Sequence, residues 1–297
     1  MGPALTSVPG RNEARIGGRR FVWHDSGGAG VPLLALHGTF GRGAVFDGLA
    51  RRLAGRVRFL APDQRGHGES APAGDFGRDA FVADAAALLR HLAGGAALPV
   101  LGHSLGGITA YQLAARHPEL VAALVVEDVG PVMRRPEIAH PVLDVRGWPR
   151  TAASREALAG ALAERGVPDA GYFLLSAVRD EATGGVRLLF DWDEMTAVQA
   201  GGVGDWWADW LGSRCPALVL RGGRSTLLPA PLAREMAGRR PGTRLVEFPG
   251  AGHWLHDDDP DGVARAVAGF LGRAVRTPRD PARPADTVDA EREEERE

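Results

Sequence analysis

The sequence predicts an α/β fold, with a mostly parallel central sheet, helices on both faces and a helical cap insertion. Two observations support this fold class. Compact apolar runs, typical of strands buried on both faces, alternate with segments of helical periodicity. One long stretch between two of these runs breaks the alternation. Strand and helix in strict alternation favour a parallel sheet that is covered on both faces.

The predicted elements follow in chain order. A hairpin comes first, because apolar residues at 14–16 and 21–24 flank the Gly-rich segment 17–20. Buried strands are then expected over residues 33–36, 57–61, 100–101, 120–126, 217–220 and 244–248. Helical spacing of apolar residues predicts helices over residues 45–53, 76–92, 105–116, 229–237 and 260–271.

Residues 131–212 contain no convincing strand, only helical fragments separated by Pro and Gly. An insertion of this length is usually functional. We expect a helical cap over the carboxyl edge of the sheet, where ligands bind in such folds. The region also holds five of the seven Trp, namely Trp148, Trp192, Trp206, Trp207 and Trp210. The last three are spaced so that at least part of the cluster faces the body of the protein, either as packing of a cap helix or as substrate contact.

Four parts of the chain are expected: an N-terminal extension (1–13), a core (14–130 and 213–272), the cap (131–212) and a disordered acidic tail (273–297). The tail lacks the apolar residues that would offset its ordering entropy. Residues 278–297 hold four Arg and eight Asp or Glu, a net charge of −4, and the whole chain carries −2, so the remainder carries about +2. A body so close to neutral argues against a nucleic-acid partner.

Composition excludes whole classes of chemistry. All 35 basic residues of the 297-residue chain are Arg. Without Lys there is no Schiff base, no anchored pyridoxal phosphate and no phosphate-loop or kinase lysine. The single Cys215 excludes disulfides within the chain and multi-Cys zinc sites. With no signal-peptide pattern and no apolar run long enough to span a bilayer, we expect a cytoplasmic protein with a small-molecule substrate and no membrane partner.

A Gly-x-Ser-x-Gly motif is the strongest chemical signal. Gly102-His103-Ser104-Leu105-Gly106 follows a predicted strand and opens a predicted helix, which is the setting that a nucleophile elbow requires. Small residues around the serine allow a strained backbone and a close helix crossing. Ser104 is therefore the candidate nucleophile, and the alternative is a serine that caps a helix.

Other motifs follow further strands of the same sheet. In His37-Gly38-Thr39, the amide of Thr39 can join that of Leu105 in binding an oxyanion. Residues 63–70 follow the next strand. Residues 250–254 follow the last one and place His253 at the same sheet edge as Ser104. A serine that precedes the histidine in the chain is the order expected of a serine hydrolase on such a sheet.

Four motifs in this order, HGTFG, DQRGHGES, GHSLGG and GAGHW, resemble those of the α/β-hydrolase superfamily over residues 14–272. The first and last look most like small esterases and thioesterases of the YbfF and ABHD11 types. The resemblance implies hydrolysis of a small or medium carboxylic ester, thioester or lactone through an acyl-enzyme. The alternatives are a carbon–carbon bond hydrolase, a lyase or a cofactor-free haloperoxidase or perhydrolase with the same triad, or a non-catalytic ligand receptor.

The acid of the triad is missing from its usual place. Most of the superfamily carries it after the strand that is here 217–220, but the loop 221–228 contains no carboxylate. Some members, including those that this chain most resembles, take it from the preceding strand, as an Asp followed three residues later by Pro. Asp128 matches that position, with Pro131 after it. Glu127 is the alternative, although it should point to the opposite face of the strand.

Residues that line the substrate pocket can also be named. Phe40, next to the oxyanion loop, is expected to line it, and His103 and Trp254 are the other candidates for substrate binding. His103 is more typical of a packing or hydrogen-bonding residue than of a catalyst. Arg134 and Arg135 enter the cap just after the acid and could meet an anionic substrate.

The remaining histidines suggest no further chemistry. We expect His37 to brace the oxyanion loop, and His67 and His256 to be loop residues. None of the nine His has a metal-ligand spacing such as HExxH. The sequence therefore predicts no metal and no cofactor.

Overall fold

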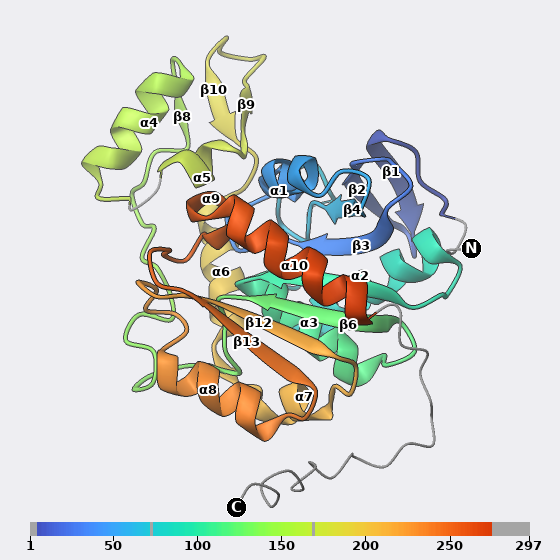
Figure 1. The fold of residues 1–297 in the computed structure, drawn as a ribbon. Helices are drawn as coiled ribbons and strands as arrows, with labels where there is room; N and C mark the ends of the chain where they lie inside the picture. The colour runs from blue at the N-terminus through green and yellow to red at the C-terminus, as the bar shows by residue number, and fades with distance from the viewer. Residues whose placement is uncertain (1–4, 72–73, 168–169, 275–297) are drawn as a thin grey trace, which may run out of the picture.

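An eight-stranded sheet forms the centre of the molecule (Figure 1). The computed structural model describes residues 5–71, 74–167 and 170–274. The strand order is β1-β2-β4-β3-β5-β6-β12-β13; β2 is antiparallel to β1 and β4, and the other neighbours are parallel. The strands are β1 Gly10–Ile16, β2 Arg19–Asp25, β3 Val31–Leu36, β4 Val57–Pro62, β5 Leu98–His103, β6 Val121–Glu127, β12 Ala217–Gly222 and β13 Thr243–Phe248. The predicted fold class is confirmed.

Helices cover both faces and create two apolar cores. The alternation of side chains along each strand divides the sheet between them: Leu33 and Ala35 of β3 belong to one core, Leu34 and Leu36 to the other. The helices around the sheet are η1 Gly43–Phe46, α1 Asp47–Arg52, α2 Arg78–Ala93, α3 Leu105–Arg116, α8 Ala230–Arg239, α9 Leu255–Asp258 and α10 Pro260–Ala274. Within the described residues, no helix combines the length and the apolar character needed to cross a membrane.

Both ends of the expected core need correction. β1 begins at Gly10 and pairs with β2 along its whole length, so residues 10–13 belong to the sheet and not to the extension 1–13. The exposed outer edge of β1 carries polar residues, which hid the strand in the sequence. At the other end, α10 extends to Ala274, two residues into the expected tail; the rest of that tail, 275–297, lies outside the described residues.

The expectation of no strand in residues 131–212 is wrong. β8, β10 and β9 form a three-stranded antiparallel sheet, and β7 pairs with β11. These strands contain two or three residues each, too few to show a period of two. The elements of this insertion are β7 Val132–Met133, β8 Thr151–Ala152, α4 Arg155–Glu164, α5 Ala170–Leu174, β9 Ala177–Arg179, β10 Val186–Leu188, α6 Trp192–Gly202, β11 Gly204–Asp205 and α7 Trp207–Gly212.

The last helix of this region, α7, packs on the core. In Figure 1 it lies beside α8, at the end of the molecule opposite α4. The buried Trp210 contacts Tyr111 of α3 with ring centroids 6.0 Å apart and donates its Nε1–H to the carbonyl of Met236 in α8. Arg239 of α8 stacks on Trp207, 4.0 Å from its ring centre. The expected boundary at residue 212 therefore assigns a core helix to the cap.

Candidate active site

Ser104 occupies a tight turn between β5 and α3. Its φ of 52° and ψ of −120° lie in a region that residues other than glycine rarely adopt. Two glycines permit this crossing: a Cβ on Gly102 would lie 2.2 Å from the carbonyl oxygen of Gly106, and one on Gly106 would lie 2.0 Å from that of Leu36. The amide of Ser104 also donates to the carbonyl of Glu127 at 3.0 Å, which ties the turn to β6.

His253 lies on the loop after β13 and contacts Asp128. Its Nδ1 is 2.8 Å from Oδ2 of Asp128, a residue with no exposed surface directly after β6. The other carboxylate oxygen, Oδ1, accepts from the amide of Gly222 at 2.9 Å, which fixes the orientation of the carboxylate. Because an ionised carboxylate only accepts, Nδ1 carries the proton and Nε2 is left as an acceptor. This is the tautomer that a general base requires.

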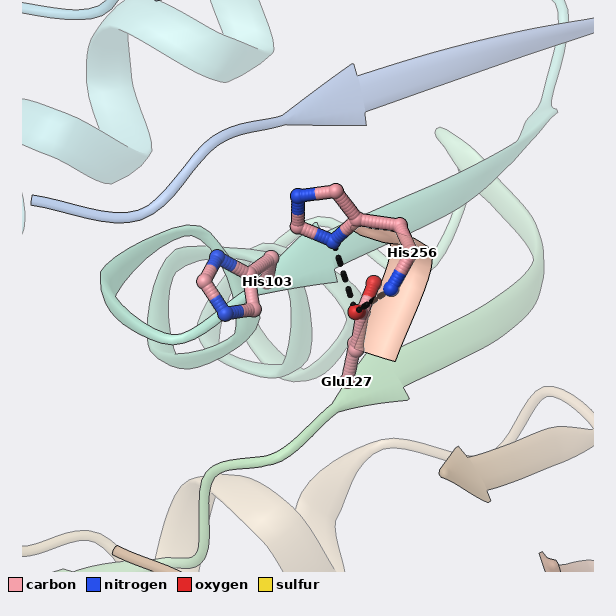
Figure 2. A group of neighbouring side chains, drawn as sticks. All are labelled: His103, Glu127 and His256. Atoms are coloured by element: carbon pink, nitrogen blue, oxygen red, sulfur yellow. Dashed lines mark hydrogen bonds and ion pairs between the residues drawn. The ribbon is translucent and has the colours of Figure 1, made fainter. Parts of the chain in front are cut away.

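Glu127, the other acid that the sequence offers, has a different partner. Its Oε1 accepts from both Nδ1 and the backbone amide of His256, at 2.7 and 3.0 Å (Figure 2). Both side chains are buried. Neighbouring residues at the end of one strand thus hold two different histidines, and only Asp128 contacts His253.

His103, Glu127 and His256 together form a buried group that we call the rear cluster (Figure 2). Nε2 of His103 is 2.9 Å from the carbonyl oxygen of His253, to which it donates. Burial, together with the neighbouring His253 and His256, holds the pKa of His103 well below its ordinary value, so its ring is neutral. Burial also acts to lower the pKa of His256, but contact with Glu127, together with the charges of Asp257 and Asp258, outweighs it and the net shift is upward.

Within the described part of the chain, the rear cluster is the one group of residues whose donor atoms could surround a metal ion, with those atoms inside 4.8 Å of one another. The sequence predicted no metal because the members of the rear cluster come from three distant segments and have no local ligand spacing. His256, expected to be a loop residue, instead lies within α9.

Two further buried histidines shape the loop 37–41. Nδ1 of His37 donates to the carbonyl of Gly38 at 2.7 Å, and its Nε2 accepts from the amide of Gln64 at 2.9 Å. Nε2 of His67 accepts from the amide of Phe40 at 3.2 Å. Burial lowers the pKa of His37 to about 4 and that of His67 to about 3. Both rings are therefore neutral and able to accept backbone hydrogen bonds, a role for His67 that the sequence did not indicate.

The two candidate oxyanion donors lie beside Ser104. Thr39 and Leu105 line the same pocket as the serine. Among the hydrogen bonds of residues 5–71, 74–167 and 170–274, none gives an acceptor to the amide of either residue. The amide of Phe40, by contrast, is already bonded to His67. The loop thus leaves the amide of Thr39 available to a ligand.

A pocket of about 420 Å³ joins these groups. Ser104 and His253 line it, as do all three predicted substrate-binding residues: Phe40, His103 and Trp254. Asp128 and Glu127 do not. The insertion contributes apolar walls, including Met133, Leu143 and Phe173. Its contact with the core is direct, because Ser176 donates to the carbonyl of Phe40 at 2.9 Å.

An arginine lines the pocket from a loop where the sequence did not suggest one. No Asp or Glu of the described residues lines it, and Arg224, on the loop after β12, is the arginine that does. Arg224 has a loose ion pair with Asp258 at 3.8 Å and a side chain that is 66% exposed. Arg134 instead pairs with Asp205 at 3.0 Å, and Arg135 donates to the carbonyl of Ala139. Neither of the arginines suggested by the sequence lines the pocket.

Sequence reasoning missed the Glu127–His256 pair and the amide of Gly222. A signal for the pair was present, since two adjacent acids at 127 and 128 match two histidines three residues apart at 253 and 256. The amide of Gly222 leaves no trace in the sequence because any residue can supply a backbone donor.

Comparison with known sequences places these motifs in a family. The model of the family described as "Alpha/beta hydrolase family" matches residues 33–266. A 2-(acetamidomethylene)succinate hydrolase of Mesorhizobium japonicum is 30% identical over 248 residues, 82% of this chain and 89% of that protein. The sn-1-specific diacylglycerol lipase ABHD11 of Mus musculus is 31% identical over 267 residues, 82% of each chain.

Solved structures have the same fold. The crystal structure of E-2-(acetamidomethylene)succinate hydrolase superimposes with a TM-score of 0.78 at 27% identity, covering 88% of this chain and 98% of that one. An α/β hydrolase from Novosphingobium aromaticivorans gives a TM-score of 0.71 at 29% identity, covering 90% and 100%. The similarity therefore extends over the insertion as well as the sheet.

Proposed function

The chain belongs to the alpha/beta hydrolase family and is a hydrolase, and we propose that it is a serine hydrolase with the triad Ser104, His253 and Asp128. The hydrogen bond from Nδ1 of His253 to Asp128, beside a serine on a strained strand-to-helix turn, carries the proposal. Both Ser104 and His253 line one pocket, which gives a substrate access to nucleophile and base together.

The proposed mechanism is supported by the hydrogen bond between His253 and Asp128. Nε2 of His253 takes the proton of Ser104 as Oγ attacks the carbonyl carbon, and Asp128 stabilises the imidazolium that forms. The amides of Thr39 and Leu105 bind the oxyanion, where each such donor is typically worth about 3–4 kcal/mol. His253 then protonates the leaving group. Water, activated by the same histidine, releases the acyl group from Ser104.

For the substrate we propose a small or medium carboxylic ester, thioester or lactone. The pocket of about 420 Å³ with apolar walls has the size and character of a small-molecule site. The part of the insertion that lines it acts, in this proposal, as the cap that sets acyl specificity. Relatives named for a diacylglycerol and for a substituted succinate indicate that the sheet supports different acyl groups. The cytoplasmic location inferred from composition stays a prediction.

Replacement of Ser104 by Ala tests the proposal. Turnover of a p-nitrophenyl ester and labelling by a fluorophosphonate should be lost, with an unchanged circular dichroism spectrum. Ser225→Ala is the matched control, because Ser225 also lines the pocket but lies on the loop after β12. Undiminished turnover by Ser104→Ala would contradict the assignment.

The same triad also supports carbon–carbon bond hydrolysis, lyase and perhydrolase chemistry. Product analysis of the wild-type protein with β-diketone, ester and peroxide substrates distinguishes them from ester hydrolysis. If the fluorophosphonate does not label the folded wild-type protein at all, the hypothesis of a non-catalytic ligand receptor on this fold is favoured instead.

A further inference from the structure

Each member of the rear cluster lies close in the chain to a residue of the proposed triad. His103 precedes Ser104, Glu127 precedes Asp128, and His256 follows His253 by three residues. We propose that Glu127 and His256, with His103, are positioning residues that hold His253 in the geometry required for proton transfer. This inference rests on the proposed function, because it assigns a role relative to Ser104 and His253.

The Glu127–His256 pair anchors the loop that carries the base. Oε1 of Glu127 binds both the ring and the backbone amide of His256, which fixes the start of α9 against the end of β6. The next residue of the same strand end, Asp128, binds the ring of His253. The segment 253–256 is thus held at both of its ends by consecutive acids. A displacement of the whole segment 253–256 relative to the end of β6 has to break both contacts.

His103 supplies a third restraint. Its neutral ring donates to the carbonyl oxygen of His253 at 2.9 Å, so it fixes the backbone of the residue whose side chain Asp128 orients. The centroid of its ring is 4.6 Å from that of His253 and 4.9 Å from that of His256. Because His103 is also the last residue of β5, the position of the base is tied directly to the strand end that carries Ser104.

The energetics of the rear cluster favour a positioning role over a purely stabilising one. Within the described residues, Glu127 Oε2, His103 Nδ1 and His256 Nε2 are buried without a hydrogen-bond partner, although His256 Nε2 lies 3.9 Å from Oδ2 of Asp257. Each unpartnered buried polar atom destabilises the fold, and a buried ion pair is often no more stable than apolar residues of similar volume. Unsatisfied polar groups of this kind require an explanation, and here all three belong to residues that hold the segment 253–256 or are part of it.

Glu127→Gln tests the proposal. The amide oxygen can still accept from the backbone of His256, but the negative charge that holds the imidazole is removed. We expect kcat for a p-nitrophenyl ester to fall about tenfold to a hundredfold, as for a catalytic group displaced by up to an ångström. KM should change less than twofold, since Glu127 does not line the pocket. The rate of fluorophosphonate labelling of Ser104 should fall by the same factor as kcat.

Asp25→Asn is the matched control. Asp25 is equally a buried acid in an ion pair, 2.7 Å from Arg58 on strands β2 and β4, and it does not line the pocket. It should lower the Tm and leave kcat unchanged. If Glu127→Gln does not fold, His256→Gln is the second variant, with the same expected loss of kcat at constant KM.

Each of the other outcomes overturns the inference. If Glu127→Gln lowers the Tm as Asp25→Asn does but keeps the wild-type kcat and labelling rate, the pair is structural only and the proposed function stands. If chelation lowers the kcat of the wild-type protein and Zn²⁺ restores it, but not in Glu127→Gln, the rear cluster is a metal centre. Absence of labelling in the wild-type protein removes the proposed function and this inference with it.

Discussion

Two acid–histidine pairs lie next to each other at the end of β6, but they differ in their exposure to the pocket. Nδ1 of His253 is 2.8 Å from Asp128, and Nδ1 of His256 is 2.7 Å from Glu127. The side chain of His253 is 16% exposed and lines the pocket, whereas that of His256 is 1% exposed and does not. A hydrogen-bonded acid and histidine are therefore not enough to indicate a general base, because access to substrate decides between them.

The backbone explains how neighbouring residues reach different partners. Glu127 is the last residue of β6, and consecutive strand residues point to opposite faces. Asp128 follows the strand with a φ of 52°, a left-handed conformation that turns the chain away from the strand direction. Its amide still donates to the carbonyl of Leu220, and its carboxylate accepts from Gly222, so the turn is held on both sides by β12.

The largest effect expected from this comparison is in Asp128→Asn. The amide cannot hold the imidazolium or fix the tautomer of His253, so kcat should fall about 10⁴-fold with the fold intact. Glu127→Gln, the same change one residue earlier, should cost about tenfold to a hundredfold. Circular dichroism first checks that both variants fold. Their kcat values for a p-nitrophenyl ester then give the ratio of the two losses. The comparison breaks if Asp128→Asn behaves like wild type while Glu127→Gln is inactive, which would make Glu127 the acid.

The sequence predicted the fold because the interior strands carry strong signals. β3, β4, β6 and β12 are apolar runs that are mostly buried, and each lies close to its expected bounds. β1 was cut short because an edge strand needs no apolar outer face. The short strands of the insertion were missed because pairing with neighbours, and not a residue pattern, defines a strand of two or three residues.

The site was only half accessible to sequence reasoning. Ser104 and His253 stand in motifs whose residues are adjacent in the chain, so local spacing makes them candidates. The pairing of Glu127 with His256 joins residues 129 positions apart and depends on how the loop after β13 folds back to β6. Sequence reasoning favoured Asp128 but kept Glu127 as the alternative for the same reason, since the folded loop determines which acid contacts which histidine.

His37 and His67, the buried histidines that contact the loop 37–41, allow a similar comparison of protonation. His37 and His67 have a lowered pKa in the folded state, so the unfolded chain binds protons more readily. Their stabilising contribution is therefore complete above about pH 6.5 and is lost as the pH falls toward 4 and below. For His37, a pKa of about 4 against 6.5 corresponds to about 3 kcal/mol. His256, with a raised pKa, has the opposite sign: its contribution is complete below about pH 6.5 and is lost as the pH rises through its folded value.

Urea unfolding of the wild-type protein and of His67→Gln between pH 7.5 and 4 measures this effect. Gln can accept the hydrogen bond of the Phe40 amide but does not titrate, so the free energy of unfolding of the variant should fall less steeply with decreasing pH. Carboxylates titrate in both proteins, and their contribution cancels in the difference. Equal slopes would show that His67 is not the neutral buried acceptor that its contacts describe.

The smallest expected effect is that of Arg224. A substrate can contact its charge, whereas the rear cluster is buried. Arg224 lines a pocket in which no carboxylate of the described residues is found, so we predict that it favours an acyl group that carries a negative charge. Its side chain is 66% exposed, and solvent screens such a charge strongly.

Arg224→Gln should therefore raise the KM for a succinate half-ester only about two- to fivefold, with less effect at high salt, and leave the KM for a neutral acetyl ester unchanged. Steady-state kinetics with both esters checks this, and an equal change for the two would mean that Arg224 shapes the pocket without recognising charge. A change for the charged ester alone would instead mean that two segments contribute differently to substrate binding. The insertion would supply the apolar walls, and the loop after β12 would supply the charge.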